Sequence, residues 1–209
     1  EALRALYTRL EFKSFLKKLP QGDAPSAAAV PALDFTTAEP TADELAALSA
    51  ADSLYYLIDR ERDSLALTAD GHKIYLVTLT DAVQKPLADL FGNESMQKIT
   101  HGCKEQYLYL TERGMPLSGR VFDSAIAAYL IDPARRDYEL TALCSDYAGL
   151  SLSADRAGEQ LTFDAPPQPT QNALAEQAAA LPVLFDVLSG QLTEEGAMDL
   201  FQTIEMPLA

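Results

Sequence analysis

The stretch of sequence that decides the fold class is QKITHGCKEQYLYLTERGMPLSGRVFDSAIAAYLIDP, residues 97–133. Short apolar runs that suit strands alternate here with longer periodic runs that suit helices. Gly114 is expected to end the first helix, because glycine adopts a left-handed conformation without strain, and Pro133 to close the second. Strands that alternate with helices indicate an α/β layered fold. In order, the expected elements are a strand at 97–100, a helix at 104–113, a strand at 120–123 and a helix at 124–132.

Upstream of this stretch, the pattern predicts strands that follow one another directly. Residues 54–58 are five consecutive apolar residues, which is typical of a buried strand. The runs at 65–69 and 72–79 flank Asp70-Gly71. Because both of these turn residues tolerate positive φ, the pattern predicts a hairpin.

Helices are expected before and after these strands in the sequence. Thr41 and Glu44 have the spacing of a capping box and predict the start of a short helix. Pro86 is expected in the first turn of a helix that runs to about Phe91, and Pro182 is expected to kink a long helix. The remaining expectations are a lead-in helix at 1–19, a linker at 20–40 with an extended segment at 33–35, a helix at 137–149, an irregular loop at 151–170, and helices at 172–192 and 193–207.

Composition excludes several classes of protein. The chain carries 31 acidic residues against 16 basic ones, and its net charge of −15 opposes contact with nucleic-acid phosphates. The two cysteines, Cys103 and Cys144, exclude a disulfide scaffold and indicate free thiols in the cytoplasm. No apolar run approaches the ~18 residues of a membrane span, and no secretory signal opens the chain. Because the chain begins at Glu1 without a methionine, we expect an excerpt from a longer protein.

The local motifs exclude further kinds of binding and catalytic site. The sequence has no phosphate-binding loop, no dinucleotide fingerprint and no serine nucleophile elbow. His101-Gly102-Cys103 is interpreted as a strand-to-helix turn, because with His72 as the one other histidine a zinc site lacks ligands. Asp123 directly precedes the helix at 124–132 and is expected to cap it.

The stretch quoted above resembles the 3′–5′ exonuclease domain of bacterial family A DNA polymerases, the DNA polymerase I type. The resemblance rests on Gly114, on Phe122-Asp123 and on the run Tyr129-Leu130-Ile131-Asp132-Pro133. The helix that follows, and the segments at both ends of the chain, resemble their counterparts in the family. The resemblance therefore extends over essentially the whole chain.

This resemblance implies an α/β, RNase H-like exonuclease fold, with a mixed central sheet and helices packed around it, in one domain spanning residues 1–209. It also implies a parent DNA-directed DNA polymerase, a nucleotidyltransferase of replication and repair that uses Mg²⁺. The polymerase and 5′ nuclease parts of that parent chain are the implied partners. Residues 193–209 would lead out toward the polymerase part.

Active members of this family hold two divalent ions with four carboxylates. The first two carboxylates form an Asp-x-Glu at the end of the first strand. If the sequence is aligned with the family by this motif, the two positions are held by Asp59 and Glu61. If it is aligned instead by the length of the strand and of the short turn after it, they are held by Ile58 and Arg60. The sequence leaves both alignments open.

The other two metal-binding positions carry neutral residues. The third falls at Gln106 and the fourth at Gln177, and Ala173 stands where the family has the tyrosine that orients the attacking water. Glu105 and Glu176 are candidate substitutes, but each is one residue, about 100° of helix rotation, out of place. Two metal ions bring about four positive charges, so a site left with two acids or none is expected to bind metal weakly.

The sequence therefore predicts a vestigial, catalytically inactive exonuclease domain that serves as a scaffold for the polymerase domain, with no metal or cofactor of its own. DNA would be bound through the parent protein and only weakly by this domain, and no membrane contact is expected. One alternative is an active proofreading exonuclease that uses Asp59 and Glu61 with Mg²⁺ or Mn²⁺. A second alternative is a protein-interaction module unrelated to polymerases.

Overall fold

The computed structural model describes residues 33–152 and 171–208 of this chain. The expected helix at 1–19, most of the linker at 20–40 and all but the first two residues of the loop at 151–170 lie outside the described residues.

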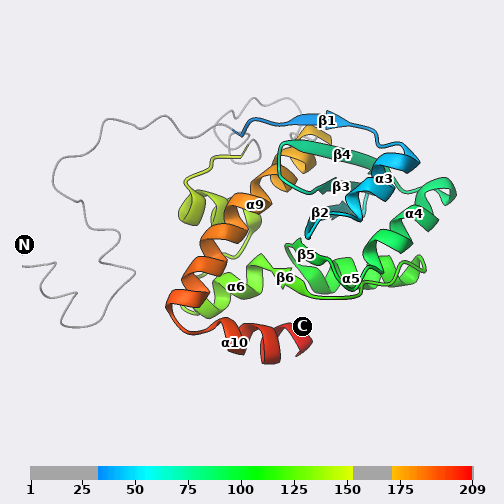
Figure 1. Ribbon diagram of the computed structural model, residues 1–209. Helices are drawn as coiled ribbons and strands as arrows, with labels where there is room; N and C mark the ends of the chain where they lie inside the picture. Colours follow the sequence, from blue (N-terminus) through cyan, green and yellow to red (C-terminus); the bar gives the residue numbers. More distant parts are fainter. Residues whose placement is uncertain (1–32, 153–170, 209) are drawn as a thin grey trace, which may run out of the picture. The chain divides into compact units, whose positions relative to one another are not determined.

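A mixed sheet forms the centre of the described part of the chain (Figure 1). In spatial order, its six strands are β1 (Thr36–Ala38), β4 (Lys73–Thr78), β3 (Ser64–Thr68), β2 (Ser53–Asp59), β5 (Gln97–Thr100) and β6 (Val121–Asp123). Strands β2, β3 and β4 pair antiparallel, whereas β1 joins β4, β5 joins β2 and β6 joins β5 in parallel. The expected mixed sheet and the expected hairpin of β3 and β4 are both confirmed.

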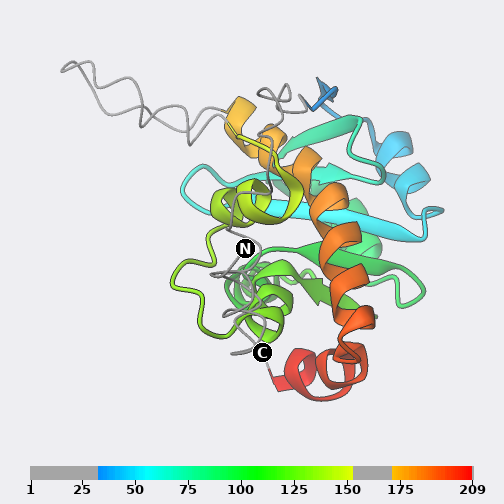
Figure 2. The same ribbon diagram turned by 90° about the vertical axis from the view of Figure 1, so that its left-hand side faces the viewer.

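Helices cover both faces of this sheet (Figure 1, Figure 2). They are α3 (Ala42–Leu48), α4 (Asp81–Phe91), α5 (Cys103–Glu112), α6 (Ser124–Ile131), α7 (Leu140–Leu143) with its continuation η1 (Cys144–Ala148), α9 (Gln171–Glu194), α10 (Met198–Leu200), η2 (Phe201–Glu205) and α11 (Met206–Leu208). Figure 2 shows α9 crossing the strands on one face of the sheet.

The alternation of side chains along β2 divides the apolar core into two clusters. Leu54 and Tyr56 face α3 and α4, and the Tyr56 ring lies edge-on to Phe91 with 5.0 Å between ring centroids. Tyr55 and Leu57 face the opposite cluster, which α6, α7 and α9 close. The sheet is therefore buried on both faces, which explains the unbroken apolar run in β2.

Local signals in the sequence fix several element ends as expected. The capping box is complete, because Glu44 N donates to Thr41 Oγ1 at 3.3 Å and Thr41 N donates to Glu44 Oε2 at 2.9 Å. Gly114 follows α5 with a φ of 68°. His101 to Cys103 form the turn between β5 and α5, with Gly102 as the N-cap of the helix.

The structure corrects three expected boundaries. Pro86 lies inside α4 rather than in its first turn, because the helix already begins at Asp81. The extended segment predicted at 33–35 is the strand β1 at Thr36–Ala38, whose place is set by parallel pairing with β4. The break after α9 comes at Gly196, with a φ of 69°, rather than at Thr193.

Helix α9 is, in the described part of the chain, the one helix long and apolar enough to cross a membrane by length and composition. Its packing accounts for that composition, since small side chains let it approach the sheet closely. A Cβ added to Gly71 would lie 3.0 Å from the Ala179 carbonyl oxygen and 3.0 Å from Pro182 Cγ. The buried residues of this helix are Ala175, Ala178, Ala179, Ala180, Leu181, Leu184, Leu188 and Leu192.

Asp123, at the end of β6, joins two helices to the sheet. Its carboxylate accepts a hydrogen bond from Ala125 N at 2.8 Å, which confirms the expected cap of α6. The same carboxylate accepts from Gly102 N at 3.1 Å and from Cys103 N at 2.6 Å, at the start of α5. Asp123 is 2% exposed. A negative charge at two helix N-termini is favourable, so one side chain fixes where both helices leave the ends of β5 and β6.

We expect Asp123→Ala to lower the free energy of unfolding by about 2–4 kcal/mol, through loss of one helix cap and of the acceptor for two further backbone N–H groups. Urea unfolding measures this change. The matched control is Asp132→Ala at the other end of α6, whose carboxylate accepts from Ala134 N at 3.3 Å. We expect the control to cost less than about 1 kcal/mol. Equal destabilisation by the two variants would contradict the role given to Asp123.

Candidate functional site

A cavity of about 400 Å³ lies where the end of β2 meets α5, the start of α7 and α9. Apolar side chains of β2, α7 and α9 form part of its wall. Its polar lining is Arg60, His101, Glu105, Gln106, Glu139, Thr141 and Gln177. This concentration of polar and charged side chains makes it the candidate functional site.

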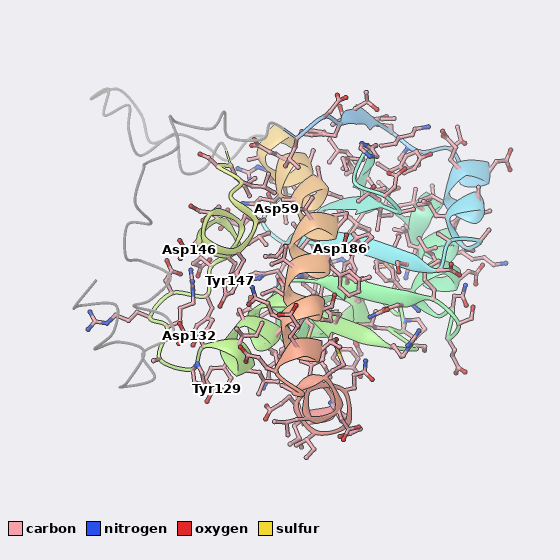
Figure 3. All side chains as sticks on the ribbon, turned by 60° about the vertical axis from the view of Figure 1, so that its left-hand side comes forward. Asp59, Tyr129, Asp132, Asp146, Tyr147 and Asp186 are labelled. Carbon is pink, nitrogen blue, oxygen red and sulfur yellow. The ribbon has the colours of Figure 1, made fainter. Side chains whose placement is uncertain are left out.

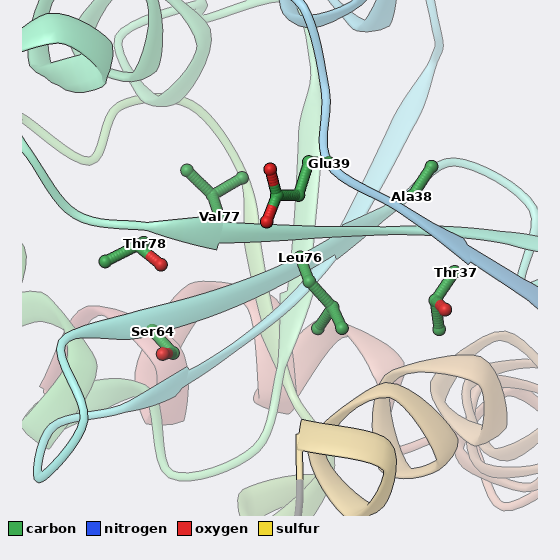
Figure 4. Close-up of a pocket in the computed structure, with 7 residues that line it drawn as sticks. All are labelled: Thr37, Ala38, Glu39, Ser64, Leu76, Val77 and Thr78. Carbon is green, nitrogen blue, oxygen red and sulfur yellow. The ribbon is translucent and has the colours of Figure 1, made fainter.

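A second hollow, of about 260 Å³, follows the edge of β4 where β1 ends (Figure 4). Among the described residues, its one charged lining side chain is Glu39, and no histidine, cysteine or cationic residue lines it. The lining residues are Thr37, Ala38, Glu39, Ser64, Leu76, Val77 and Thr78. This hollow offers little to hold a metal ion or a phosphate.

Gln106 and Gln177, which the family resemblance places at the third and fourth metal-binding positions, both line the candidate site. Gln106, on α5, is 6% exposed, and its Nε2 donates to the carbonyl oxygen of His101. Its Oε1 is buried and has no hydrogen-bond partner among the described residues. Gln177, on α9, is half-buried. The fold thus brings together two side chains that lie far apart in the sequence, and both are neutral amides.

Of the two alignments left open for the first pair, the residues that line the cavity are Ile58 and Arg60. Asp59, labelled in Figure 3, instead organises the turn after β2. Its Oδ1 accepts from Glu61 N at 3.1 Å and from Arg62 N at 3.2 Å, and its Oδ2 pairs with Arg62 Nη1 at 2.6 Å. Glu61 is exposed. Within the described ranges, neither Asp59 nor Glu61 belongs to the lining of this cavity.

Arg60 is exposed and lies beside the ring of Tyr109. Its guanidinium carbon lies 5.6 Å from the ring centroid, and the guanidinium of Arg113 lies 3.7 Å from it. The hydroxyl of Tyr109 donates to Asp63 Oδ1 at 2.5 Å, and Arg113 Nη2 pairs with the same oxygen at 2.5 Å. Burial, followed by the bond to Asp63, raises the pKa of Tyr109 to about 12. These contacts fasten the turn between β2 and β3 to α5 and keep a positive charge beside the cavity.

Two carboxylates also line the cavity. Glu105 does so beside Gln106, the position from which it was expected to be about 100° of helix rotation out of place. Glu139, the residue before α7, is a lining residue that no motif in the sequence indicated. The second candidate substitute, Glu176, is not in the lining.

A pair of divalent ions does not fit these residues. In the ranges 33–152 and 171–208, no three His, Cys, Asp or Glu side chains come close enough together to hold a metal ion. Hard ions need several anionic oxygen ligands. The cavity offers the carboxylates of Glu105 and Glu139, neutral amides, and the opposing charge of Arg60.

His101 lines the cavity at the turn before α5. Its Nδ1 lies 2.9 Å from Ser124 Oγ, which in turn donates to the Thr100 carbonyl oxygen at 3.3 Å. Burial lowers the pKa of His101 below its usual value, and the nearby carboxylates of Asp123 and Glu139 oppose this shift only in part. The imidazole is therefore neutral near pH 7.

Known proteins resemble this chain in sequence. The family described as "DNA polymerase I, ribonuclease H-like domain" matches residues 55–157. DNA polymerase I of Geobacillus stearothermophilus is 28% identical over 220 residues, covering 100% of this chain and 25% of the relative. DNA polymerase I of Mycobacterium tuberculosis is 30% identical over 146 residues, covering 67% of this chain and 16% of the relative. The chain thus spans about a quarter or less of the length of these relatives.

Solved structures agree on the fold. The POL domain of Pol1 from M. smegmatis, in complex with DNA primer-template and dNTP, superposes with a TM-score of 0.64 at 23% identity, over 79% of this chain and 28% of that one. Brucella melitensis NrnC bound to pGG superposes with a TM-score of 0.61 at 17% identity, over 74% of this chain and 79% of that one.

The six-stranded mixed sheet and its structural neighbours define a ribonuclease H-like exonuclease fold. More particularly, the chain is a 3′–5′ exonuclease-like domain of the bacterial DNA polymerase I family. The expected fold class and the resemblance that suggested it are confirmed. The alternative of a module unrelated to polymerases is set aside.

We expect His101 to titrate below the ordinary histidine pKa of about 6.5. Because the unfolded chain then binds this proton more tightly, the stability contributed by neutral His101 is complete above about pH 6.5 and is lost as the pH falls toward the folded-state pKa. An NMR titration of the imidazole signals, assigned with His101→Gln, measures the pKa. A midpoint at or above 6.5 would show that burial does not govern this group.

Proposed function

We propose that this chain is a vestigial 3′–5′ exonuclease domain that no longer cleaves DNA and serves as a structural scaffold within a DNA polymerase. The observation that carries the proposal is the set of side chains at the cavity. Gln106, Gln177 and Arg60 all line the cavity. The family resemblance places the two glutamines at positions where active members have carboxylates, and Arg60 adds a positive charge. No catalytic or metal-binding residue is therefore assigned in this domain.

Charge supports the same conclusion on two scales. At the cavity, Arg60 repels cations, and its guanidinium lies beside the ring of Tyr109. Over the whole chain, a net charge of −15 opposes the approach of a DNA strand. A nuclease needs both a cation site and an approach path for phosphates, and both are disfavoured here.

The activity of the parent protein belongs to this proposal as well. The relatives are DNA polymerase I chains, of which the Geobacillus stearothermophilus protein is about four times as long as the region aligned with this chain, and one related structure contains DNA primer-template and dNTP. We infer a cytoplasmic, Mg²⁺-dependent DNA polymerase of replication and repair, in which this domain adjoins polymerase and 5′ nuclease parts. DNA would reach the protein through those parts.

The rival function is an active proofreading exonuclease. One observation favours it, namely that Glu105 and Glu139 line the cavity and supply two carboxylates. Asp59 and Glu61 would have to join them, but Asp59 is bonded to the turn through both of its oxygens. The turn after β2 would have to be rebuilt before these four acids could share a metal ion.

We expect the 209-residue chain to leave a 5′-labelled single-stranded oligonucleotide intact in the presence of Mg²⁺ or Mn²⁺, because the cavity lacks a carboxylate cluster that could hold two ions. Gel analysis over several hours measures 3′ trimming. The variants Asp59→Ala and Glu105→Gln are the controls for a contaminating nuclease. Metal-dependent trimming that either variant abolishes would establish the rival function.

The same oligonucleotide should bind this chain only weakly, with a dissociation constant above the micromolar range at about 0.15 M salt. Fluorescence anisotropy reports this directly. Submicromolar binding would mean that a local cationic surface overrides the net charge.

A further inference from the structure

The side-chain amide of Gln106 offers one unused hydrogen-bond acceptor at the cavity of about 400 Å³. The side chain is 6% exposed, and its Nε2 donates to the carbonyl oxygen of His101. Because a carbonyl oxygen accepts and never donates, this bond fixes which end of the amide faces His101. Oε1 is therefore the end that has no hydrogen-bond partner among the described residues. A buried acceptor without a donor is unfavourable, so the cavity wall is complete only when a donor reaches Oε1.

His101 supplies a second acceptor to the lining of the same cavity. Its Nδ1 lies 2.9 Å from Ser124 Oγ, and that hydroxyl uses its own proton in the bond to the Thr100 carbonyl oxygen. Nδ1 is therefore the nitrogen that carries the imidazole proton and donates it to Ser124 Oγ. The other ring nitrogen, Nε2, carries a lone pair. Two residues of the lining thus offer acceptors that belong to uncharged groups.

The charged side chains of the lining leave a small negative excess. Glu105 and Glu139 are acidic, Arg60 is basic, and all three are exposed. The whole chain has a net charge of −15, which favours the approach of a cation over that of an anion. A ligand that carries hydrogen-bond donors and a positive charge therefore suits both the buried acceptors and the charge around them.

We propose that this cavity binds a monovalent organic cation, an ammonium or guanidinium group on a short apolar body, an inference that rests on the loss of metal binding proposed above. The cationic group donates N–H bonds to Gln106 Oε1 and to His101 Nε2. The apolar body contacts the apolar part of the lining, which consists of Leu57, Ile58, Leu140 and Leu174. The volume of the cavity lies within the range of small-molecule sites.

The arrangement of the acceptors favours such a cation over a divalent metal ion. A metal ion of this kind needs several anionic oxygens around one point. In the ranges 33–152 and 171–208, no three His, Cys, Asp or Glu side chains come that close together. The N–H groups of an ammonium or guanidinium point in different directions and reach acceptors that lie apart. One positive charge also balances the small negative excess of the lining, whereas two divalent ions would exceed it.

A titration followed by NMR tests this inference. The isotope-labelled 209-residue chain is titrated with n-butylammonium and with n-butylguanidinium. The matched control is n-butyltrimethylammonium, which has the same charge and a similar apolar body but no N–H donor. We expect saturable shifts of the Gln106 side-chain amide signals with at least one of the two donors, with a dissociation constant in about the millimolar range. The control should bind at least about tenfold more weakly, because it leaves the two acceptors unpaired.

A pair of variants locates the binding. Gln106→Met keeps the length of the side chain and removes the acceptor, so we expect about tenfold weaker binding of the better donor ligand. Gln84→Met is the matched control, because Gln84 Nε2 also donates to a backbone carbonyl oxygen, that of Arg113 at 2.5 Å, and Gln84 does not line this cavity. It should bind as the natural chain does. Should Gln106→Met fail to fold, the comparison of ligands on the natural chain still decides.

Each other outcome overturns the proposal. Equal binding of n-butyltrimethylammonium would show that the chain responds to charge and apolar contact alone. The absence of saturable shifts up to about 50 mM would leave the cavity to water. Shifts confined to residues away from the cavity would assign the binding to the acidic surface. Metal-dependent trimming of DNA is measured without any organic cation and would refute only the proposed loss of catalysis, so the two proposals fail separately.

Discussion

The buried carboxylate of Asp123 is the interaction on which the rest of the site depends. It accepts hydrogen bonds from the first N–H groups of α5 and of α6, so it fixes two helices at the ends of two neighbouring parallel strands. Helix α5 in turn carries Gln106, which lines the cavity, and Tyr109, whose ring lies beside Arg60. Because backbone N–H groups satisfy this carboxylate, the arrangement holds without a metal ion.

The cavity shows how a fold and its chemistry can be maintained by different residues. The sheet is fixed by apolar side chains on both of its faces and by Asp123, none of which needs a charged cavity. Asp59 closes the turn after β2 by accepting hydrogen bonds from the backbone of that turn, and Arg60 lies beside the ring of Tyr109. Under the proposed function, exchanging acids for neutral or basic residues at the cavity leaves these supports in place. The neutral Gln106 then lowers the stability of the fold by little more than the penalty for one buried oxygen without a hydrogen-bond partner.

Local chemistry in the sequence predicted most of the fold, whereas the composition of the site depended on contacts between distant segments. The cap at Asp123 and the helix end at Gly114 follow from residue type and spacing alone. The contact of Arg60 with Tyr109 and the position of Glu139 at the cavity depend on how β2, α5 and α7 pack, and no local pattern records that. A shift of one residue in a strand reverses every side chain, so sequence matching alone could not choose between the two alignments of the first pair.

Calorimetric titration of Mn²⁺ into the 209-residue chain tests the central claim most directly, because it asks whether the cavity holds ions without requiring turnover. The comparison is a variant with Ile58→Asp, Arg60→Glu, Gln106→Asp and Gln177→Asp, which puts four acids at the four positions and removes the cation. The account predicts no saturable binding by the natural chain up to about millimolar Mn²⁺, and a gain of affinity in the variant. Two saturable sites at micromolar Mn²⁺ in the natural chain would contradict it.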